Sequence, residues 1–457
     1  MAGASSPYYL LKEEFVQRRD EGCKLPSELF AAFDALDTVE DEWNLERINP
    51  IYDALMELPV DSVLQAAEPN ELEAIRALRP DGPRTLGWNP SDEELVDKLH
   101  GAWTGRCVGC ALGKPVEHRG MQRDENHKIN GRRTTKAYLQ KRGDWPLADY
   151  FSNRDLGDGD NLPDFYQSYR ENIAYMEPDD DIHYTLVALG VLEEHGAAFT
   201  WEDVARYWIS HLPISAICTA EMQAMLNVLN VSRKGHHITK NAQWVSTHRN
   251  PYREWIGAQI RSDGYAYACA GNPGRAAEFA WRDAHWTHRR NGIYGAMMFA
   301  AMQAAAFVIS NPFELVQIGL SEIPKNCRLA QRVRQCLGWI DTHSDFEFCM
   351  ETFEEELNDL HVIHTINNAL ICIIAMCYGK MDATQTPAIA VMCGLDSDCN
   401  GATVGSMVGA IAGRKNFGGI LADQLNDTIQ PNLLGFQTVT MKELAQRTAT
   451  VWKTLAD

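Results

Sequence analysis

Apolar residues recur every three to four positions along most of the chain, which is the spacing of one face of an α-helix. The pattern first appears in short acidic segments, such as PSELFAAFDAL and NELEAIRAL, before about Arg84. It returns over residues 92–113 and in segments that begin near Asp181, Glu202, Pro213, Arg275, Gly292, Pro312, Ala330, Phe346, His361, Asp398 and Lys442. Alternating patterns bounded by hairpin turns, which indicate strands, are nearly absent. The sequence therefore predicts an all-α protein.

A turn-rich stretch, RPDGPRTLGWNPSDEE, separates the first helices from the rest of the chain. Ser91 followed by Glu94 is typical of a capping box at the start of a helix. We therefore expect an acidic helical segment of unknown role over residues 1–90 and one larger domain over residues 91–457. Residues 118–164 are polar, rich in glycine and charge, and without a clear period, so they are predicted to form a long loop or lid.

In two of the predicted helices glycine recurs at every fourth position, and we call each such series a glycine ladder. Spacing by four keeps the glycines of each ladder on one helix face, where another backbone can approach closely. The ladders therefore predict two central helices in tight contact, although each glycine weakens its own helix by about 1 kcal/mol relative to alanine. Their members are Gly101, Gly105, Gly109 and Gly113, then Gly401, Gly405, Gly409 and Gly413.

Composition argues against nucleic-acid-binding, membrane and secreted disulfide-rich proteins. The formal net charge of -20 opposes nonspecific binding to nucleic acid or to an anionic membrane. The most apolar stretch, 369–377, is far shorter than the roughly 20 residues of a membrane helix, and the first residues lack the pattern of a secretory signal. The 12 cysteines then favour reduced thiols in the cytoplasm over a disulfide framework. The oligomeric state stays open.

Two acidic motifs stand at predicted helix starts. The first is Asp179, Asp180 and Asp181, and the second is Asp396 and Asp398 in the sequence GLDSDCN. One aspartate is enough to cap a helix, whereas several adjacent carboxylates repel one another unless a cation neutralises them. Oxygen ligands of this kind suit hard cations such as Mg²⁺, Ca²⁺ or Mn²⁺.

A glutamate follows the first glycine ladder directly. In Gly113-Lys114-Pro115-Val116-Glu117 the proline ends the helix and leaves Glu117 beside the glycine face. An isolated glutamate there is most simply a surface residue. Beside a metal centre it becomes the candidate for proton transfer.

Taken in order, GxxxGxxxGxPxE, an acidic triplet that opens a helix, and GxDxD before a small-residue helix resemble the ADP-ribosylglycohydrolases. The resemblance covers roughly residues 92–455 and implies an orthogonal all-α bundle with two Mg²⁺ ions, or Mn²⁺, that grip the hydroxyls of a ribose. It implies a catalytic or substrate-positioning role for Glu117. It also implies metal ligands at Asp179, Asp180, Asp181, Asp396, Asp398 and Cys399, and substrate contacts at Gly113, His288, Asn291 and Asn400.

Two positions depart from the family pattern. Asp179 and Cys399 both stand where the family has threonine, and a thiol is a poor ligand for Mg²⁺. Two other motifs compete as metal sites. Cys107 and Cys110 have CxxC spacing, and His361 and His364 would share a helix face, but without a second CxxC or the glutamate of HExxH both pairs are better explained as core residues.

The sequence is thus interpreted as that of a metal-dependent hydrolase that cleaves an N- or O-glycosidic bond of an ADP-ribosyl or related ribosyl substrate. One alternative is a hydrolase of free ribosides. Another is a protein that binds ADP-ribose without catalysis or has a structural, crystallin-like role. The N-terminal segment has no counterpart in the resemblance.

Overall fold

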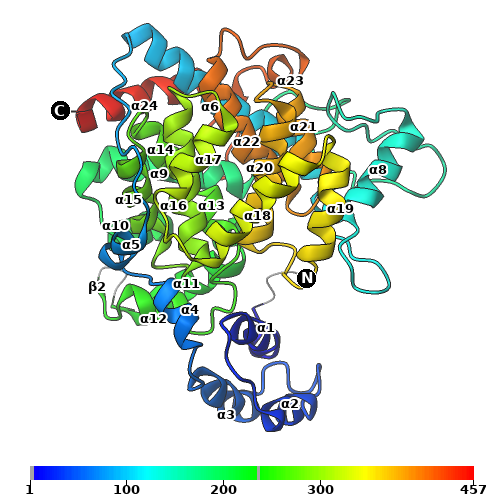
Figure 1. Ribbon diagram of the computed structural model, residues 1–457, viewed down its shortest axis with the longest axis vertical. Coiled ribbons are helices and arrows are strands. Elements are labelled where there is room, and N and C mark those ends of the chain that lie inside the picture. The colour runs from blue at the N-terminus through cyan, green and yellow to red at the C-terminus, as the bar shows by residue number, and fades with distance from the viewer. Residues whose placement is uncertain (1–4, 234–236, 457) are drawn as a thin grey trace.

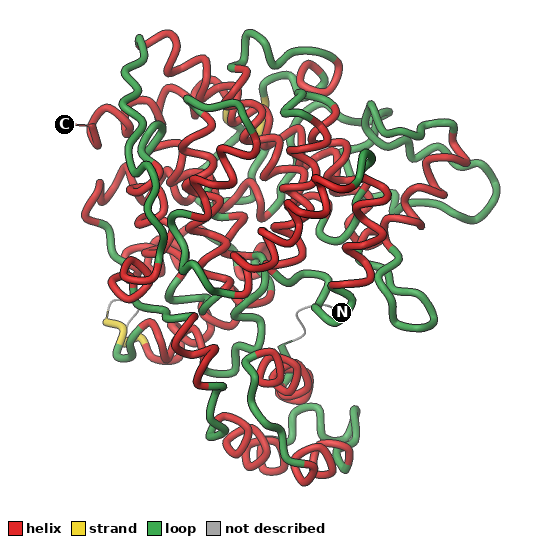
Figure 2. The backbone as a smooth tube through the Cα atoms, viewed as in Figure 1, coloured by secondary structure: helices red, strands yellow, loops and turns green. Residues whose placement is uncertain are grey.

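The computed structural model describes residues 5–233 and 237–456, which form helices joined by loops and short strands (Figure 2). The described strands make two antiparallel pairs, β1 (Ser232–Arg233) with β2 (His237–Ile238) and β3 (Thr428–Ile429) with β4 (Val439–Thr440). The predicted all-α class is confirmed. None of the described helices is both long enough and apolar enough to cross a membrane.

The first three helices form a lobe of their own at the bottom of Figure 1: α1 (Pro7–Asp20), α2 (Ser27–Asp34) and α3 (Leu45–Met56). Their apolar side chains bury one another in a small core that is separate from the main one. Its members are Tyr8, Leu11, Phe15, Leu36, Ile48, Ile51, Tyr52 and Leu55.

Charged contacts attach this lobe to the main body. Arg253 of the main body pairs with Glu14 at 2.7 Å and with Glu21 at 3.0 Å, and all three side chains are buried. The chain then passes through α4 (Ser62–Ala67) and α5 (Leu72–Leu78) into the main body, where Ile75 joins the large core.

Two long helices run through the centre of the main body, α6 (Asp92–Gly113) and α22 (Ser397–Ala412). Ser91 caps α6 by accepting a hydrogen bond from the backbone of Glu94 at 3.2 Å. The two glycine ladders pack against each other, and the helices that carry them run antiparallel. A Cβ on Gly105 would lie 2.0 Å from the carbonyl oxygen of Gly405, and one on Gly109 would lie 1.9 Å from that of Gly401. The predicted tight contact is confirmed, because only glycine fits at this backbone separation.

The other helices surround this pair (Figure 1). Those before residue 310 are α9 (Asp180–His195), η2 (Gly196–Ala198), α10 (Trp201–His211), η3 (Ile214–Ala216), α11 (Thr219–Val231), α12 (Ala242–Thr247), α13 (Gly257–Ile260), α14 (Asp263–Ala268), α15 (Pro273–Ala284) and α16 (Asn291–Ala306). Those after it are α17 (Pro312–Leu320), α18 (Arg328–Thr342), α19 (Phe346–Glu356), α20 (Thr365–Gly379), α21 (Gln385–Met392), α23 (Ile420–Asp423) and α24 (Met441–Ala456).

The expectation that residues 118–164 form only a loop is wrong in part. A short helix, α7 (Glu117–Gly120), begins this stretch, and α8 (Gly131–Arg142) lies within it. Helix α8 attaches to α19 through a buried ion pair of 2.8 Å between Arg132 and Glu354. Tyr138 and Leu139 also add this helix to the main core, but most of its other residues are polar, so its hydrophobic period is weak in the sequence.

Two predicted helix starts also differ from the structure. The segment expected to begin at Pro213 is the single turn η3, and α11 begins only at Thr219. The segment expected at His361 begins at Thr365, because the imidazole of His364 accepts the backbone hydrogen bond of Ile366 and caps α20.

Candidate active site

The acidic motifs meet where α6 ends and α22 begins. A Cβ on Gly113 would lie 2.2 Å from the carbonyl oxygen of Ser397, so the last turn of α6 touches the first turn of α22. Helix α6 continues into the turn η1 (Lys114–Val116), and Glu117 follows directly. The glycine packing therefore brings the end of one ladder beside the aspartates that open the other.

Two groups of ligand atoms overlap at this junction. In the first, Glu117, Asp396 and Asp398 each offer an atom within 4.8 Å of the others. In the second, Asp181, Asp398 and Cys399 do the same. Asp398 belongs to both groups, so this residue of the second acidic motif links Glu117 with Asp181 of the first.

Two buried oxygens at the junction have no hydrogen-bond partner among the described residues. They are Oδ2 of Asp181, which is 0% exposed, and Oδ1 of Asp398, which is 4% exposed. An unpaired carboxylate oxygen that is removed from water is costly unless a cation or a donor binds it. The carboxylates of the two groups are also the ligand type that hard divalent cations prefer. The residues present thus fit a divalent metal.

A third group is already neutralised by the chain's own cations. It consists of Cys110, Asp179 and Asp181. The ammonium of Lys114 lies 2.8 Å from Oδ2 of Asp179 and donates to the carbonyl of Pro178 at 2.6 Å.

The guanidinium of Arg106, which is fully buried, likewise lies 3.0 Å from Oδ1 of Asp181 and 3.0 Å from Oδ2 of Asp263. Internal positive charge therefore reaches the acidic triplet from the face of α6. The three remaining aspartates of the junction, Asp180, Asp396 and Asp398, form no ion pair with the described residues.

Burial and mutual repulsion shift the pKa values of the carboxyl groups at the junction. Burial first, and then the charge of Asp398, raises the pKa of Glu117 well above its usual value. Burial and Asp179 raise the pKa of Asp180 to about 8, and burial and Asp179 raise that of Asp398 to about 6. Burial also opposes ionisation of Asp179, but the ammonium of Lys114 outweighs it and lowers the pKa. Clustered groups with pKa values moved apart are typical of functional sites.

The sequence model of one known family, described as ADP-ribosylglycohydrolase, matches residues 91–454. The chain belongs to the ADP-ribosylglycohydrolase family. A solved structure described as an "ADP-ribosylglycohydrolase-related protein complex" aligns with 80% of this chain and 100% of its own, at 17% identity and a TM-score of 0.45. Comparison with curated proteins gave no match.

The family assignment confirms the resemblance inferred from the three motifs. It also gives the activity in outline, a glycohydrolase that acts on ADP-ribosyl substrates. ADP-ribosylglycohydrolases generally use divalent metals, and the acidic groups of this chain are suited to hold them.

Not every predicted metal ligand lies in one of these groups. Asp180 is partly exposed, and its Oδ2 lies 3.8 Å from the thiol of Cys218. Cys399 is buried in the second group, where burial raises the pKa of its thiol well above the usual value. A protonated thiol is a weak ligand, so carboxylates dominate the second group.

The four predicted substrate residues of this ADP-ribosylglycohydrolase lie in packed surroundings. Gly113 contacts the backbone of Ser397, as described above. Asn400 is fully buried, and its amide donates to Asn368 at 2.8 Å. Asn368 in turn accepts the backbone hydrogen bond of Asp396 at 3.2 Å, so Asn400 helps to position the second acidic motif.

His288 and Asn291 are 0% exposed and both have hydrogen-bond partners, although Nε2 of His288 has none among the described residues. The His288 ring lies 2.8 Å from the Thr287 hydroxyl and 3.9 Å from the Glu221 carboxylate. The Asn291 amide donates to Glu254 at 2.8 Å and to Glu68 at 3.1 Å. The structure thus places both side chains among buried polar partners rather than in the acidic groups.

The competing cysteine and histidine motifs are core residues, as the sequence favoured. Cys107 and Cys110 are fully buried, and burial raises the pKa of both thiols. His361 stacks on Trp255 with ring centroids 4.1 Å apart, and His364 caps α20. Cys110 alone approaches the acidic triplet.

Sequence reasoning missed the internal cations of the site. Arg106, Cys110 and Lys114 are spaced by four on α6 and its extension, so they share one face. Two cationic residues on the face that leads to Glu117 are a signal that could have predicted their approach to an acidic motif.

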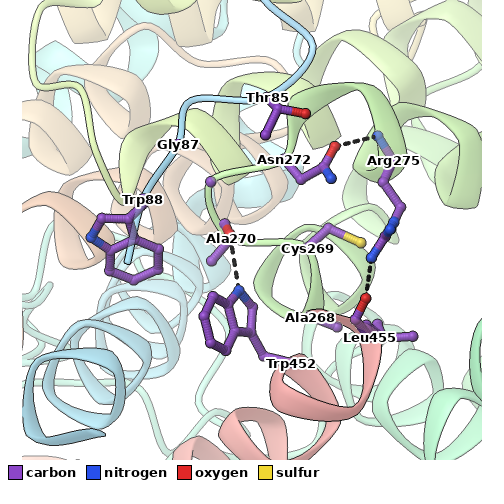
Figure 3. Close-up of a pocket in the computed structure, with 11 residues that line it drawn as sticks. Thr85, Gly87, Trp88, Ala268, Cys269, Ala270, Asn272, Arg275, Trp452 and Leu455 are labelled. Atoms are coloured by element: carbon purple, nitrogen blue, oxygen red, sulfur yellow. Dashed lines mark hydrogen bonds between the residues drawn. The ribbon is translucent and has the colours of Figure 1, made fainter. Parts of the chain in front are cut away.

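A cavity of about 190 Å³ elsewhere in the molecule has a different character (Figure 3). It lies between the 85–88 segment, the turn before α15 and the end of α24. Its main polar groups already have partners, since Trp452 donates to Ala270 at 2.9 Å and Arg275 donates to the carbonyl of Leu455. None of the acidic groups lines it.

Proposed function

We propose that this protein hydrolyses the N- or O-glycosidic bond at the anomeric carbon of an ADP-ribosyl substrate and needs a divalent metal, Mg²⁺ or Mn²⁺, to do so. The observation that carries the proposal is the pair of unpartnered buried oxygens, Asp181 Oδ2 and Asp398 Oδ1, beside Glu117. Buried carboxylate oxygens without a hydrogen-bond partner are suited to bind a cation. The family indicates the class of substrate.

Asp181 and Asp398, with Asp396 at the edge of the first group, would hold the metal. When bound, it would orient the ribose through its hydroxyls and stabilise negative charge that develops on oxygen. Arg106 fixes the rotamer of Asp181 through a contact of 3.0 Å, and Asn368 holds the backbone of Asp396. Ligands fixed in this way lose little freedom on binding.

Glu117 is the residue that we assign to proton transfer. Its raised pKa lets it keep a proton at a pH where an exposed glutamate has lost it. It can then donate the proton to the departing atom of the glycosidic bond, and as a carboxylate it can accept one from the attacking water. Its carboxylate lies within 4.8 Å of ligand atoms of Asp396 and Asp398, which supports a role beside the metal.

Two aromatic side chains beside the junction are suited to a flat ring of the substrate. The ring centroid of Tyr166 lies 5.7 Å from the ammonium of Lys114, and Phe165, whose ring contacts that of Tyr166, is 69% exposed. An exposed aromatic face can stack on a base. We assign this pair to contact the adenine.

The proposal is tested by release of free ADP-ribose from peptides modified on arginine, serine, aspartate or glutamate, and from O-acyl-ADP-ribose, with Mg²⁺ and with excess chelator. We expect release from at least one substrate in Mg²⁺ and none in chelator. Asp398→Asn is the diagnostic variant, and Asp382→Asn, at an exposed cap outside the described acidic groups, is its control. Full turnover in excess chelator would contradict the metal-dependent mechanism.

One observation favours a second candidate, a protein that binds ADP-ribose without cleaving it. Lys114 neutralises Asp179 and Cys399 is a weak ligand, so part of the expected metal centre is replaced by groups that do not need a metal. Tight binding of ADP-ribose with no release from any of these substrates would support this candidate.

A further inference from the structure

A second cavity, of about 510 Å³, lies between the N-terminal helices and the main body. Arg18 on α1 and Gln65 on α4 line it from one side. Gln243 on α12 and the adjacent Arg289 and Arg290, just before α16, line it from the other. Its volume is within the range of small-molecule sites, roughly 300–1,000 Å³.

Two arginines of this cavity are buried without an acidic partner. Arg289 and Arg290 are each only 7% exposed. Neither forms an ion pair with a described residue, and Nη1 of Arg290 has no hydrogen-bond partner. A guanidinium that is removed from water without a partner is costly, so two adjacent ones need an explanation.

No carboxylate that lines the cavity forms an ion pair with these arginines, although the charge of Arg290 acts over a longer distance to lower the pKa of Glu21 and of the neighbouring Glu254. Glu21 is engaged by Arg18 at 2.5 Å and by Arg253 at 3.0 Å. Glu68 is engaged by Arg328 at 2.8 Å. The third, Glu71, is exposed and acts on Arg289 only over a longer distance. The guanidinium groups of Arg289 and Arg290 therefore have carboxylates in their surroundings but none in direct contact.

The backbone of this wall is held in an uncommon conformation. Arg290 has φ of 48°, a region that non-glycine residues rarely adopt. Its N–H donates to the side chain of Asn70 at 2.7 Å, and Asn70 itself lines the cavity. The segment between α4 and α5 thus fixes the arginine in place. Strain that the surroundings maintain in this way is typical of binding sites.

We propose that this cavity binds a phosphate-bearing anion, a diphosphate or a nucleotide, through Arg289 and Arg290. The planar guanidinium offers two parallel N–H donors that match two oxygens of a phosphate. Arg18 lines the opposite side, but its three guanidinium nitrogens already donate to Leu55, Glu21 and Leu58, so Arg289 and Arg290 are the anion ligands. The inference does not depend on the proposed hydrolase activity, because no residue of the acidic groups lines this cavity.

The test is binding of inorganic pyrophosphate and of ADP to the full chain, measured by calorimetry and by thermal unfolding. Excess chelator is present throughout, so that metal-assisted binding of phosphate at the acidic junction is removed. We expect the double variant Arg289→Gln/Arg290→Gln to bind pyrophosphate more weakly by on the order of tenfold or more. The matched control is Arg334→Gln, which removes an exposed arginine of α18 and should bind like the wild type.

A second readout distinguishes loss of binding from loss of folding. Because neither guanidinium forms an ion pair, the double variant should unfold at about the same temperature as the wild type when no anion is present. It should also lose the anion-dependent protection of α4 from hydrogen exchange. If the double variant does not fold, Arg290→Lys replaces it, since lysine keeps the charge but loses the paired donors.

Three results would overturn the proposal. One is no binding of either ligand to the wild type at millimolar concentration. Another is equal binding by wild type and double variant. The third is equal stabilisation by sulfate at the same ionic strength, which would make the cavity a nonspecific anion site. Tighter binding of ADP than of pyrophosphate identifies a nucleotide, and equal binding identifies the diphosphate alone as the recognised group.

Discussion

The ammonium of Lys114 lies 2.8 Å from Oδ2 of Asp179, inside the acidic junction where the family pattern predicts a metal ligand. The side chains of both residues are buried, at 10% and 6% exposure. A lysine fixed in this position neutralises part of the negative charge of the acidic triplet. Asp179 therefore needs a cation less than the aspartates that have no ion pair.

Replacing Lys114 with methionine should therefore change the number of ions bound. Without metal, Lys114→Met leaves Asp179 as an unpaired buried charge and should lower the free energy of unfolding by about 3–5 kcal/mol. Mn²⁺ should restore most of that loss, and calorimetry should detect one more ion per chain than in the wild type. Lys415→Met, at an exposed ion pair, is the control. An unchanged stoichiometry would mean that Lys114 does not replace a metal.

Glu117→Gln tests the proton-transfer role. Positioned acids and bases contribute about a hundredfold to ten-thousandfold in rate, so turnover should fall by that order. Binding of ADP-ribose should survive with little loss, because the amide keeps the shape of the side chain. Glu125→Gln, at an exposed position of the same stretch, should leave turnover unchanged. Near wild-type turnover in Glu117→Gln would refute the assignment.

Cys399→Thr restores the residue that the family pattern has at this position. The hydroxyl is a harder ligand than the thiol, so Mg²⁺ should bind more tightly and any preference for Mn²⁺ or Zn²⁺ should weaken. Metal titrations of both proteins measure this, with Cys377→Ser, a half-buried cysteine outside the described metal groups, as control. Identical affinities and an identical ranking of metals would make Cys399 a packing residue.

Replacing glycine with alanine should have opposite effects on stability inside and outside the glycine ladders. Gly105→Ala would place a Cβ 2.0 Å from the carbonyl of Gly405, and we expect a loss of about 3 kcal/mol or more in the free energy of unfolding. Gly338 lies in α18 with no atom within 4 Å of its added Cβ. Gly338→Ala should stabilise the protein by up to about 1 kcal/mol, because alanine is the better helix former. Urea denaturation of both variants decides this prediction, and equal effects would contradict it.

A buried histidine makes stability depend on pH. Burial lowers the pKa of His364 from 6.5 to about 4, while its ring accepts the hydrogen bond that caps α20. The unfolded chain binds this proton more readily, so the stabilisation is complete above pH 6.5 and is lost as the pH falls toward 4, by up to about 3 kcal/mol.

His364→Asn keeps a capping acceptor and removes the titration. The variant should therefore lose less stability than the wild type between pH 6.5 and pH 4 in urea denaturation. Parallel pH profiles of the two proteins would show that another group dominates this window.

The sequence by itself determined the helical class, the start of α6 at its Ser91 cap, the contact between the glycine ladders and the identity of the two acidic motifs. These follow from local rules: a period of 3.6 residues, a cap at a helix start, and the space that a missing side chain leaves. The order of the three motifs was also enough to indicate the family that the match over residues 91–454 confirmed.

Only the tertiary structure decided which charges meet. Arg106 and Lys114 reach the acidic triplet because α6 crosses the start of α9. Their spacing places them on one helix face, but only the packing of α6 against α9 decides which carboxylates they meet. Helix α8 was missed because only Tyr138 and Leu139 add it to the main core, and a pair of adjacent apolar residues gives no helical period. The structure also shows that His288 and Asn291, which are predicted to contact the substrate, are buried beside polar partners of the protein. The sequence does not contain this, because the polarity of a side chain does not state whether its partner is a ligand or the protein itself.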